Sequence, residues 1–369
     1  MYKTIEELVT RVDERNSDGT VSELIGVSID KCFIKSVANT NGTDLSKYKI
    51  IHKNDFAVSL MQVSRDGKIP VARLEEYEEA IMSPAYPIFR VKDKNIILPE
   101  YLEMWFKRPE FDREAAFIAI GGVRGSMPWE EFAKMKLPVP PIEKQRKIVN
   151  AYKIVTDRIA LKQKINDNLL NSVQAIFRSW FVDYDPFDGV CPSNWETGGV
   201  EDIAEFFDSM RKPLSSLERA DMERIYPYYG AVSIVDYVDD YIFDGEYLLV
   251  SEDGIYVVDE NGHPLIQHIS GKFWANNHAH ILKGKAGFNE DSLYLFLANT
   301  NMAPIVTGAA QPKINQANLK SFPITIPDSE TMLKFNNIIQ PFFDQRLTNE
   351  SEIKKLDALQ SLLLTRLVD

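Results

Sequence analysis

Residues 142–181 read IEKQRKIVNAYKIVTDRIALKQKINDNLLNSVQAIFRSWF, a run without proline or glycine that predicts one long helix. Its apolar positions recur every seven residues, with a second series four residues further on, which is the a/d pattern of a coiled-coil seam. The predicted seam comprises Ile148, Tyr152, Val155, Ile159, Lys162, Asn166, Leu169, Val173, Ile176 and Trp180.

A second copy of this helix follows 187 residues later and covers residues 328–369. Its predicted seam comprises Phe335, Ile339, Phe342, Arg346, Asn349, Ile353, Leu356, Gln360, Leu363 and Leu367. Both seams are apolar at their ends and polar near the middle. Polar residues in a seam lower stability but fix register and orientation.

Two such helices in one chain, each following a globular segment, most simply pair antiparallel. At 1.5 Å per residue, a helix of this length spans about 58 Å. The alternative is a pair of ordinary amphipathic core helices, but stripes this long exceed the usual helix of a globular domain.

The chain therefore divides into four segments: residues 1–141, 142–184, 185–327 and 328–369. We predict a mixed α/β fold, in which two globular α/β domains are separated by two long helices that form an antiparallel coiled coil. Within the first globular segment, the pattern predicts a short amphipathic helix over Ile5 to Val12 and a polar loop over Gln62 to Lys68. The C-terminal ends of the two globular segments align without a gap, while the rest of the two segments differs in sequence. This suggests one recognition task performed on two different targets.

The composition excludes several classes of protein. The net charge is −12, which argues against a generic nucleic-acid coat, because that binding depends on Lys and Arg contacts with phosphates. The two cysteines, Cys32 and Cys191, suggest a reducing cytoplasm and neither a disulfide framework nor a zinc site. No apolar run reaches membrane length and no signal peptide is expected, so we expect a cytoplasmic protein without membrane contact.

Four strings in the chain resemble the specificity subunits of type I restriction–modification systems. They are TGAAQPKIN at 307–315, FPITIP at 322–327, LPVPPIEKQ at 137–145 and FRSWFVDYDP at 177–186. The resemblance covers nearly the whole chain, and the combination of strings is specific. The first globular segment departs from the pattern, with RGSMP at 124–128 where the second has QPKIN.

This resemblance implies a non-catalytic subunit with two target-recognition domains, residues 1–141 and 185–327. Each domain would read one half of a split, asymmetric sequence in double-stranded DNA, and the coiled coil would set the gap between the halves. Two methyltransferase subunits would dock on this scaffold, and restriction subunits would join for cleavage. S-adenosylmethionine, ATP and magnesium would belong to those partners.

Candidate DNA contacts were chosen because Arg, Lys, Asn, Gln and small polar side chains read base edges and phosphates. In the first domain they are Gln62, Arg65, Lys68, Arg124 and Ser126. In the second they are Lys272, Asn276, Asn277, Gln311, Lys313 and Asn315. Arg124 and Gln311 are the strongest pair, because one loop position carries two different side chains.

No pattern in the sequence indicates catalysis or a metal site. His278 and His280 are expected to project from one side of a strand, with Glu252 and Asp253 upstream, but no third ligand has a typical spacing. A structural or DNA-facing role is therefore favoured for these histidines. A second reading of the whole chain remains open, namely a coiled-coil scaffold that binds proteins and no DNA.

Overall fold

The computed structural model describes residues 1–36, 43–61, 63–120, 125–308 and 310–368. The chain forms two compact units, which are described separately. The first comprises Met1–Lys162 with Ser351–Asp369, and the second comprises Gln163–Glu350. Among the described residues, none of the helices combines the length and the apolar character needed to cross a membrane.

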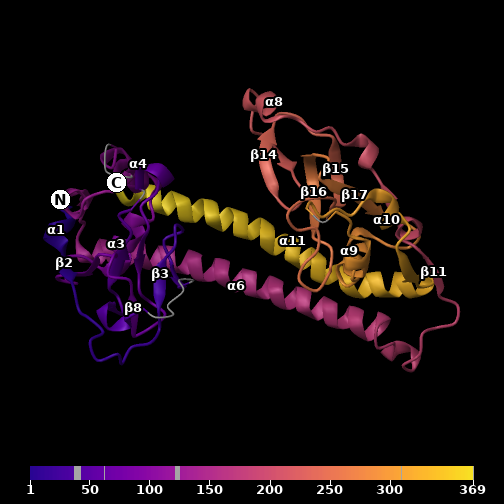
Figure 1. Ribbon diagram of the computed structural model, residues 1–369, viewed down its shortest axis with the longest axis horizontal. Helices are drawn as coiled ribbons and strands as arrows, with labels where there is room; N and C mark the ends of the chain where they lie inside the picture. The colour runs from indigo at the N-terminus through magenta and orange to yellow at the C-terminus, as the bar shows by residue number, and fades with distance from the viewer. Residues whose placement is uncertain (37–42, 62, 121–124, 309, 369) are drawn as a thin grey trace. The chain divides into compact units, whose positions relative to one another are not determined.

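Two long helices contribute to both units: α6 (Ile142–Phe181) and α11 (Ser329–Thr365) (Figure 1). Helix α6 begins directly after Pro140 and Pro141, because proline lacks the N–H that an earlier turn would need. It ends at Phe181, and three residues later Tyr184 adopts a left-handed conformation with φ 57°.

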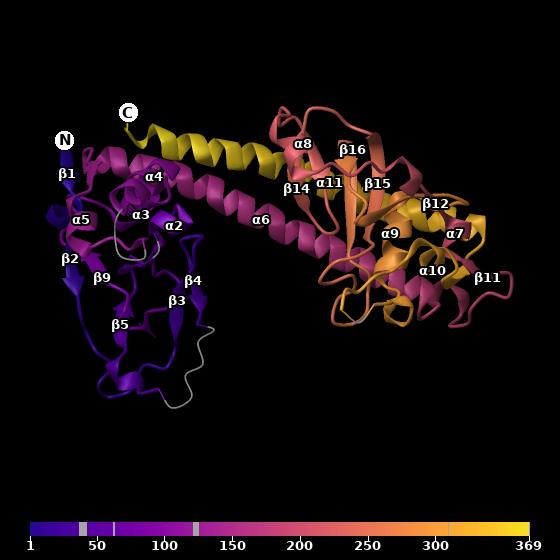
Figure 2. The same cartoon turned by 45° about the horizontal axis from the view of Figure 1, so that its top comes forward.

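The first unit contains a four-stranded sheet in the order β2-β9-β6-β7 and three two-stranded pairs, β1-β10, β3-β4 and β5-β8. Its elements besides the long helices are β1 (Tyr2–Thr4), α1 (Ile5–Leu8), β2 (Val9–Val12), β3 (Ile25–Val27), β4 (Phe33–Lys35), η1 (Leu45–Lys47), β5 (Lys49–His52), β6 (Phe56–Val58), α2 (Val63–Asp66), β7 (Val71–Arg73), β8 (Glu79–Met82), β9 (Ile88–Val91), α3 (Pro99–Phe106), α4 (Pro109–Ile118), α5 (Trp129–Lys134), β10 (Lys136–Pro138) and η6 (Arg366–Val368). Helices α2 and α4 lie side by side (Figure 2).

The second unit contains a six-stranded sheet in the order β12-β17-β15-β16-β13-β14 and one pair, β11-β18. Its elements are η3 (Asp185–Phe187), β11 (Glu196–Gly199), α7 (Val200–Ile203), β12 (Ala204–Phe206), η4 (Asp208–Met210), α8 (Ser216–Ala220), β13 (Tyr226–Tyr229), β14 (Ile234–Val238), β15 (Phe243–Ser251), β16 (Ile266–Ala275), β17 (Ala279–Gly284), α9 (Glu290–Ala298), η5 (Ala303–Ile305), α10 (Gln316–Lys320) and β18 (Pro323–Ile326). Helix α9 packs against the central strands of this sheet (Figure 1).

The two units share a frame around their different sheets. In each, an N-terminal strand pairs antiparallel with the exit strand: β1 with β10, and β11 with β18. A one-turn helix follows at once, α1 or α7, and leads into an edge strand of the sheet. A short helix, α5 or α10, precedes each exit strand. The predicted repeat is thus visible in the frame, whereas the sheets inside it differ in strand number and order.

Each unit buries its stretch of the helix pair in its own core. In the first unit, Leu364 and Leu367 near the end of α11 join a core that also contacts Tyr152 of α6. In the second, Val173 of α6 and Phe335 of α11 belong to the core under β15 and β17. Burying these apolar faces removes them from water and fixes each helix on its domain.

The helices run antiparallel within both units. In the first, Gln360 Nε2 donates to Thr156 Oγ1 over 2.8 Å, and Lys162 Nζ lies 2.8 Å from Glu352 Oε2. In the second, Asn349 Nδ2 donates to Asn166 Oδ1 over 2.7 Å, and the ring centroids of Trp180 and Phe335 lie 5.8 Å apart. As the residue number rises along α6, the number of its partner falls along α11.

The predicted seam positions lie on the inner sides of both helices. All twenty, from Ile148 to Trp180 and from Phe335 to Leu367, are buried or half-buried, while most residues between them are exposed. The polar centre of the seam contains the Asn166–Asn349 hydrogen bond. This bond fixes the register of the two helices, which a purely apolar seam would leave unspecified.

Two local expectations were wrong. The helix expected over Ile5 to Val12 ends at Leu8, because Val9–Val12 pairs with β9 as a strand of the sheet. Within the expected polar loop of residues 62–68, Val63–Asp66 forms the one-turn helix α2. In both places long-range packing overrides the local pattern.

Candidate nucleic-acid interface

Two candidates of the first domain, Arg65 and Ser126, lie close together where Gly125 meets α2. Gly125 has φ +71°, which favours glycine, and a Cβ there would lie 2.6 Å from Ser64 Oγ, so a side chain would displace the Ser64 hydroxyl. Met127 N–H donates to Leu60 O over 2.8 Å. These contacts bring Ser126 next to the segment that carries Arg65.

The charged candidates of this domain lie near carboxylates. Arg65 Nε is 3.0 Å from Asp66 Oδ1, and Lys68 Nζ is 3.9 Å from Asp30 Oδ1. Both side chains are about half exposed or more, so these pairs contribute little to stability and can exchange for phosphate contacts. The predicted contacts Gln62 and Arg124 lie outside the described residues.

In the second domain, a loop over residues 307–315 presents the matching candidates. The backbone closes on itself, because Thr307 and Lys313 exchange two N–H···O bonds of 2.8 Å each. Gly308 has φ +85°, and a Cβ there would lie 2.3 Å from Gln311 O. This tight turn exposes Gln311, one of the two strongest candidates. We refer to residues 307–315 as the 307–315 loop; Ala309 lies outside the described residues.

Two candidates at the end of this loop have partners within the protein. Lys313 Nζ is 2.9 Å from Glu252 Oε1 and remains partly exposed. Asn315 is the N-cap of α10, and its Oδ1 accepts the Asn318 N–H over 2.8 Å. Its side-chain oxygen is therefore engaged in capping the helix, a role that the sequence analysis did not consider.

The remaining candidates lie on and beyond β16. Asn276 is buried, and its Oδ1 accepts the His278 N–H over 2.8 Å, so it shapes the turn between β16 and β17. Asn277 is exposed at the same turn. Lys272 Nζ lies 4.4 Å from the ring centroid of Tyr241, and a hydrogen bond with this tyrosine raises the pKa of the lysine.

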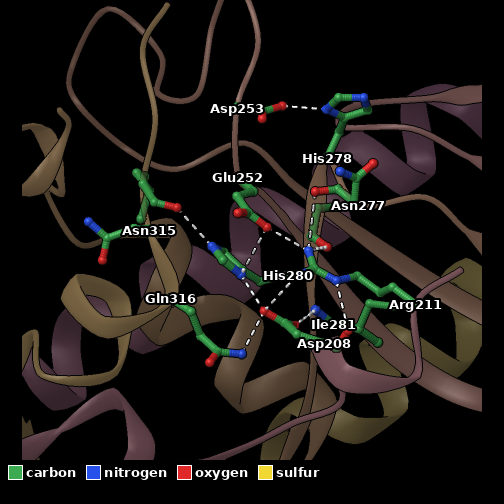
Figure 3. A network of polar contacts seen from close by, with 12 residues as sticks. Asp208, Arg211, Glu252, Asp253, Asn277, His278, His280, Ile281, Asn315 and Gln316 are labelled. Atoms are coloured by element: carbon green, nitrogen blue, oxygen red, sulfur yellow. Dashed lines mark hydrogen bonds and ion pairs between the residues drawn. The ribbon is translucent and has the colours of Figure 1, made fainter. Parts of the chain in front are cut away.

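A polar network connects the turn at Asn277 with the 307–315 loop (Figure 3). Arg211 is at its centre: its guanidinium lies 2.5 Å from Glu252 Oε2 and donates to the carbonyls of Ala279 (2.8 Å) and Asn277 (3.3 Å). Lys313 contacts the other oxygen of Glu252. The network thus connects four segments that lie far apart in the sequence.

The fully buried His280 forms the inner part of this network. Its Nδ1 lies 2.6 Å from Asp208 Oδ2, and its Nε2 lies 2.8 Å from Ile314 O. Burial alone would raise the pKa of Asp208, but its bonds with His280 and the Ile281 N–H, together with the charge of Arg211, outweigh burial and lower it. Likewise, burial of Glu252 is outweighed by Arg211 and Lys313, which lower its pKa.

The expectation that both histidines project from one side of a strand was wrong, because His280 lies on β17 while His278 precedes that strand and is exposed, with its Nδ1 2.5 Å from Asp253 Oδ1. The contacts of the buried His280 agree with the favoured structural role. Sequence reasoning missed Asp208 altogether. Asp208 follows β12, and the antiparallel pairing of β12 with β17 brings Asp208 beside His280. No local sequence pattern predicts this pairing.

Asp208, Glu252 and His280 present possible metal-ligand atoms within 4.8 Å of one another. The surroundings do not suit a cation, however. Arg211 and Lys313 already neutralise the two carboxylates, and Gln316 Nε2 donates to Asp208 Oδ2 over 2.7 Å. A metal ion would have to displace these donors, so the cluster is better described as a salt-bridge network.

The amino-acid sequence matches one family model over most of its length. The model is the type I restriction modification DNA specificity domain, and it matches residues 20–171 and again residues 192–359. The chain belongs to this family. It contains two specificity domains, and each match extends into the long helix that follows its globular segment.

Named relatives carry the same description. A putative type I restriction enzyme specificity subunit of Haemophilus influenzae is 39% identical over 128 residues, which are 35% of this chain and 32% of the relative. The MjaIX specificity subunit of Methanocaldococcus jannaschii is 23% identical over 300 residues, covering 74% of this chain and 69% of the relative. Both are specificity subunits, so this chain is grouped with the non-catalytic component of such systems.

The fold agrees with a solved specificity subunit. The crystal structure of the type I restriction–modification S subunit from M. genitalium aligns with a TM-score of 0.58 at 13% identity, covering 100% of this chain and 96% of that one. The predicted mixed α/β fold with two globular domains and long paired helices is therefore confirmed. The individual DNA contacts remain predictions.

Proposed function

We propose that this specificity subunit reads a split, asymmetric sequence in double-stranded DNA, with one half-site for each domain. The observation that supports this most strongly is the repeated frame around unlike sheets, of four strands in one unit and six in the other. Equal frames would attach two recognition surfaces in equivalent ways. Unlike interiors would give each surface its own base preferences.

The paired helices would then serve as a spacer and an assembly scaffold. A two-stranded coiled coil resists bending better than a loop, so it suits a protein that must fix the distance between half-sites. Two methyltransferase subunits would dock on it, with restriction subunits joining for cleavage in the cytoplasm. S-adenosylmethionine, ATP and magnesium would be bound by those partners.

The decisive experiment is co-expression of this chain with its cognate methyltransferase, followed by mapping of modified adenines in the host genome. The methyltransferase expressed without this chain is the control. A split motif with two different halves, present only with both proteins, supports the proposal. Unmodified DNA or a contiguous palindrome would contradict it.

The second candidate function is a scaffold that binds only proteins. Two observations favour it: the net charge of −12, and the carboxylates near Arg65, Lys68 and Lys313. The two functions differ in their response to salt. DNA binding through phosphates weakens steeply as salt increases, because counterions are released from the duplex. An assembled complex whose DNA affinity and salt dependence are unchanged by Lys68→Ala and Lys313→Ala would favour the scaffold.

A further inference from the structure

Both nitrogens of the His280 ring have a partner inside the protein. The Nε2 atom faces the carbonyl oxygen of Ile314 at 2.8 Å, and a carbonyl oxygen can only accept a hydrogen bond. The Nδ1 atom faces Asp208 Oδ2 at 2.6 Å.

Asp208 is surrounded by donors. Its Oδ1 accepts the Ile281 N–H over 2.9 Å, and its Oδ2 accepts from Gln316 Nε2 over 2.7 Å. The guanidinium of Arg211 lies 3.4 Å from the same Oδ2. A carboxyl group with these neighbours is stabilised in its ionised form and is held in place beside His280.

Charged groups surround the ring. Glu252 Oε2 lies 3.6 Å from Nδ1, so two carboxylates face the ring. Arg211 contacts both of these carboxylates, and Lys313 contacts Glu252. The buried ring thus has a polar partner on each side, as a buried polar group must have.

The bond from His280 to Ile314 controls the 307–315 loop. Ile314 is fully buried between Lys313 and Asn315, and both of its backbone groups are fixed. Its N–H donates to Glu252 O over 2.8 Å, and its C=O accepts from His280.

We propose that His280 is a positioning residue that holds the 307–315 loop, through its bond to Ile314, in the conformation with which the second domain reads its half-site. This inference rests on the proposed function. It assigns His280 no contact with DNA. Its effect on recognition passes through Ile314 to the exposed Gln311 and the partly exposed Lys313, which the loop presents.

Two substitutions separate the bonds of the ring. In His280→Asn, the amide nitrogen lies near the position of Nδ1, so the bond to Asp208 is kept and the bond to Ile314 is lost. In His280→Gln, the amide nitrogen lies near the position of Nε2, so the bond to Ile314 is kept. His263→Asn is the matched control, because His263 lies in a turn with Asp259 outside this network.

Each variant is co-expressed with the cognate methyltransferase, and its modified-adenine motif is compared with that of the wild type. We expect His280→Asn to reduce discrimination roughly tenfold at bases of one half-site only, about the contribution of one base contact. His280→Gln should restore most of it, and His263→Asn should leave the motif unchanged. A merely structural role would weaken modification at every site without relaxing one half of the motif.

Two outcomes would overturn the inference while leaving the proposed function intact: a folded His280→Asn variant with an unchanged motif, or a His280→Gln variant that relaxes the motif as much as His280→Asn does. A wild-type complex with no split motif would overturn the proposed function and this inference together.

Discussion

The polar pair in the centre of the helix seam offers a quantitative test of how register is fixed. Asn349 is 1% exposed; its Nδ2 donates to Asn166 Oδ1 over 2.7 Å, and its Oδ1 accepts from Gln345 Nε2 over 3.0 Å. Asn349→Ala breaks both bonds, whereas Asn166→Ala breaks one of them. At about 1 kcal/mol for each bond, we expect losses of unfolding free energy of about 2 and about 1 kcal/mol.

The double variant should cost less than the sum of the single ones, because the shared bond is lost only once. The expected coupling energy between the two asparagines is about 1 kcal/mol. A larger value is not expected, because Asn166 is only half-buried and water can hydrogen-bond its side chain when Asn349 is replaced. Urea unfolding of the full chain, followed by helical circular dichroism, measures all four corners of the cycle.

The exposed ion pair of Arg158 with Glu352 on the same two helices is the matched control. It should show clearly weaker coupling, because exposed charges are screened by solvent. A cycle for the asparagine pair that closes within about 0.3–0.5 kcal/mol would refute the reasoning, since independent sites add within that margin.

Three further predictions concern charge, spacing and contact. Burial, followed by the charge of Glu246, raises the pKa of Asp291 to about 7. Burial lowers the pKa of the neighbouring His268 to about 4. Between these two values both side chains are neutral, so they form no ion pair. Between about pH 4 and 6.5 the folded state holds an extra proton on Asp291 but lacks the one that His268 binds when unfolded, so the two opposite contributions to the pH dependence of stability largely cancel. Asp291→Asn removes only the first contribution, so the thermal stability of this variant should rise with pH over that range, and a profile as flat as that of the wild type would contradict the assignment. A heptad inserted into the middle of both long helices adds about 10 Å, which should widen the gap in the modified motif by about 3 base pairs; an unchanged gap would show that the helices are not the spacer. Arg124→Ala and Gln311→Ala should each weaken DNA binding of the assembled complex by about 1–3 kcal/mol in filter binding at fixed salt without unfolding the chain; wild-type affinity in both would refute the assignment.

The seam and the repeated frame could be predicted from sequence because both depend on local periodicity. Burial of Val155, Val173 or Phe335 requires only that two helices pair along stripes seven residues apart. The exit strands likewise follow from strings repeated at a constant offset, such as Leu137–Val139 and Ile324–Ile326.

The network around His280 could not be predicted, because its members meet only through the sheet. Asp208, Glu252 and His280 lie on separate strands or their extensions, and the antiparallel pairings of β17 with β12 and β15 bring them together. Asn315 illustrates a different limit: its residue type suits both a base contact and a helix N-cap, and only the structure shows that it caps α10.

Independent reading of two half-sites is the central claim, and one comparison tests it most directly. The modified-adenine motif is determined for Arg124→Ala and for Gln311→Ala, each assembled with the cognate methyltransferase. Because the substituted residues belong to different domains, one variant should relax bases in one half of the motif and the other variant bases in the other half, with the gap unchanged. Relaxation of the same half by both variants, or of both halves by either, would contradict the account.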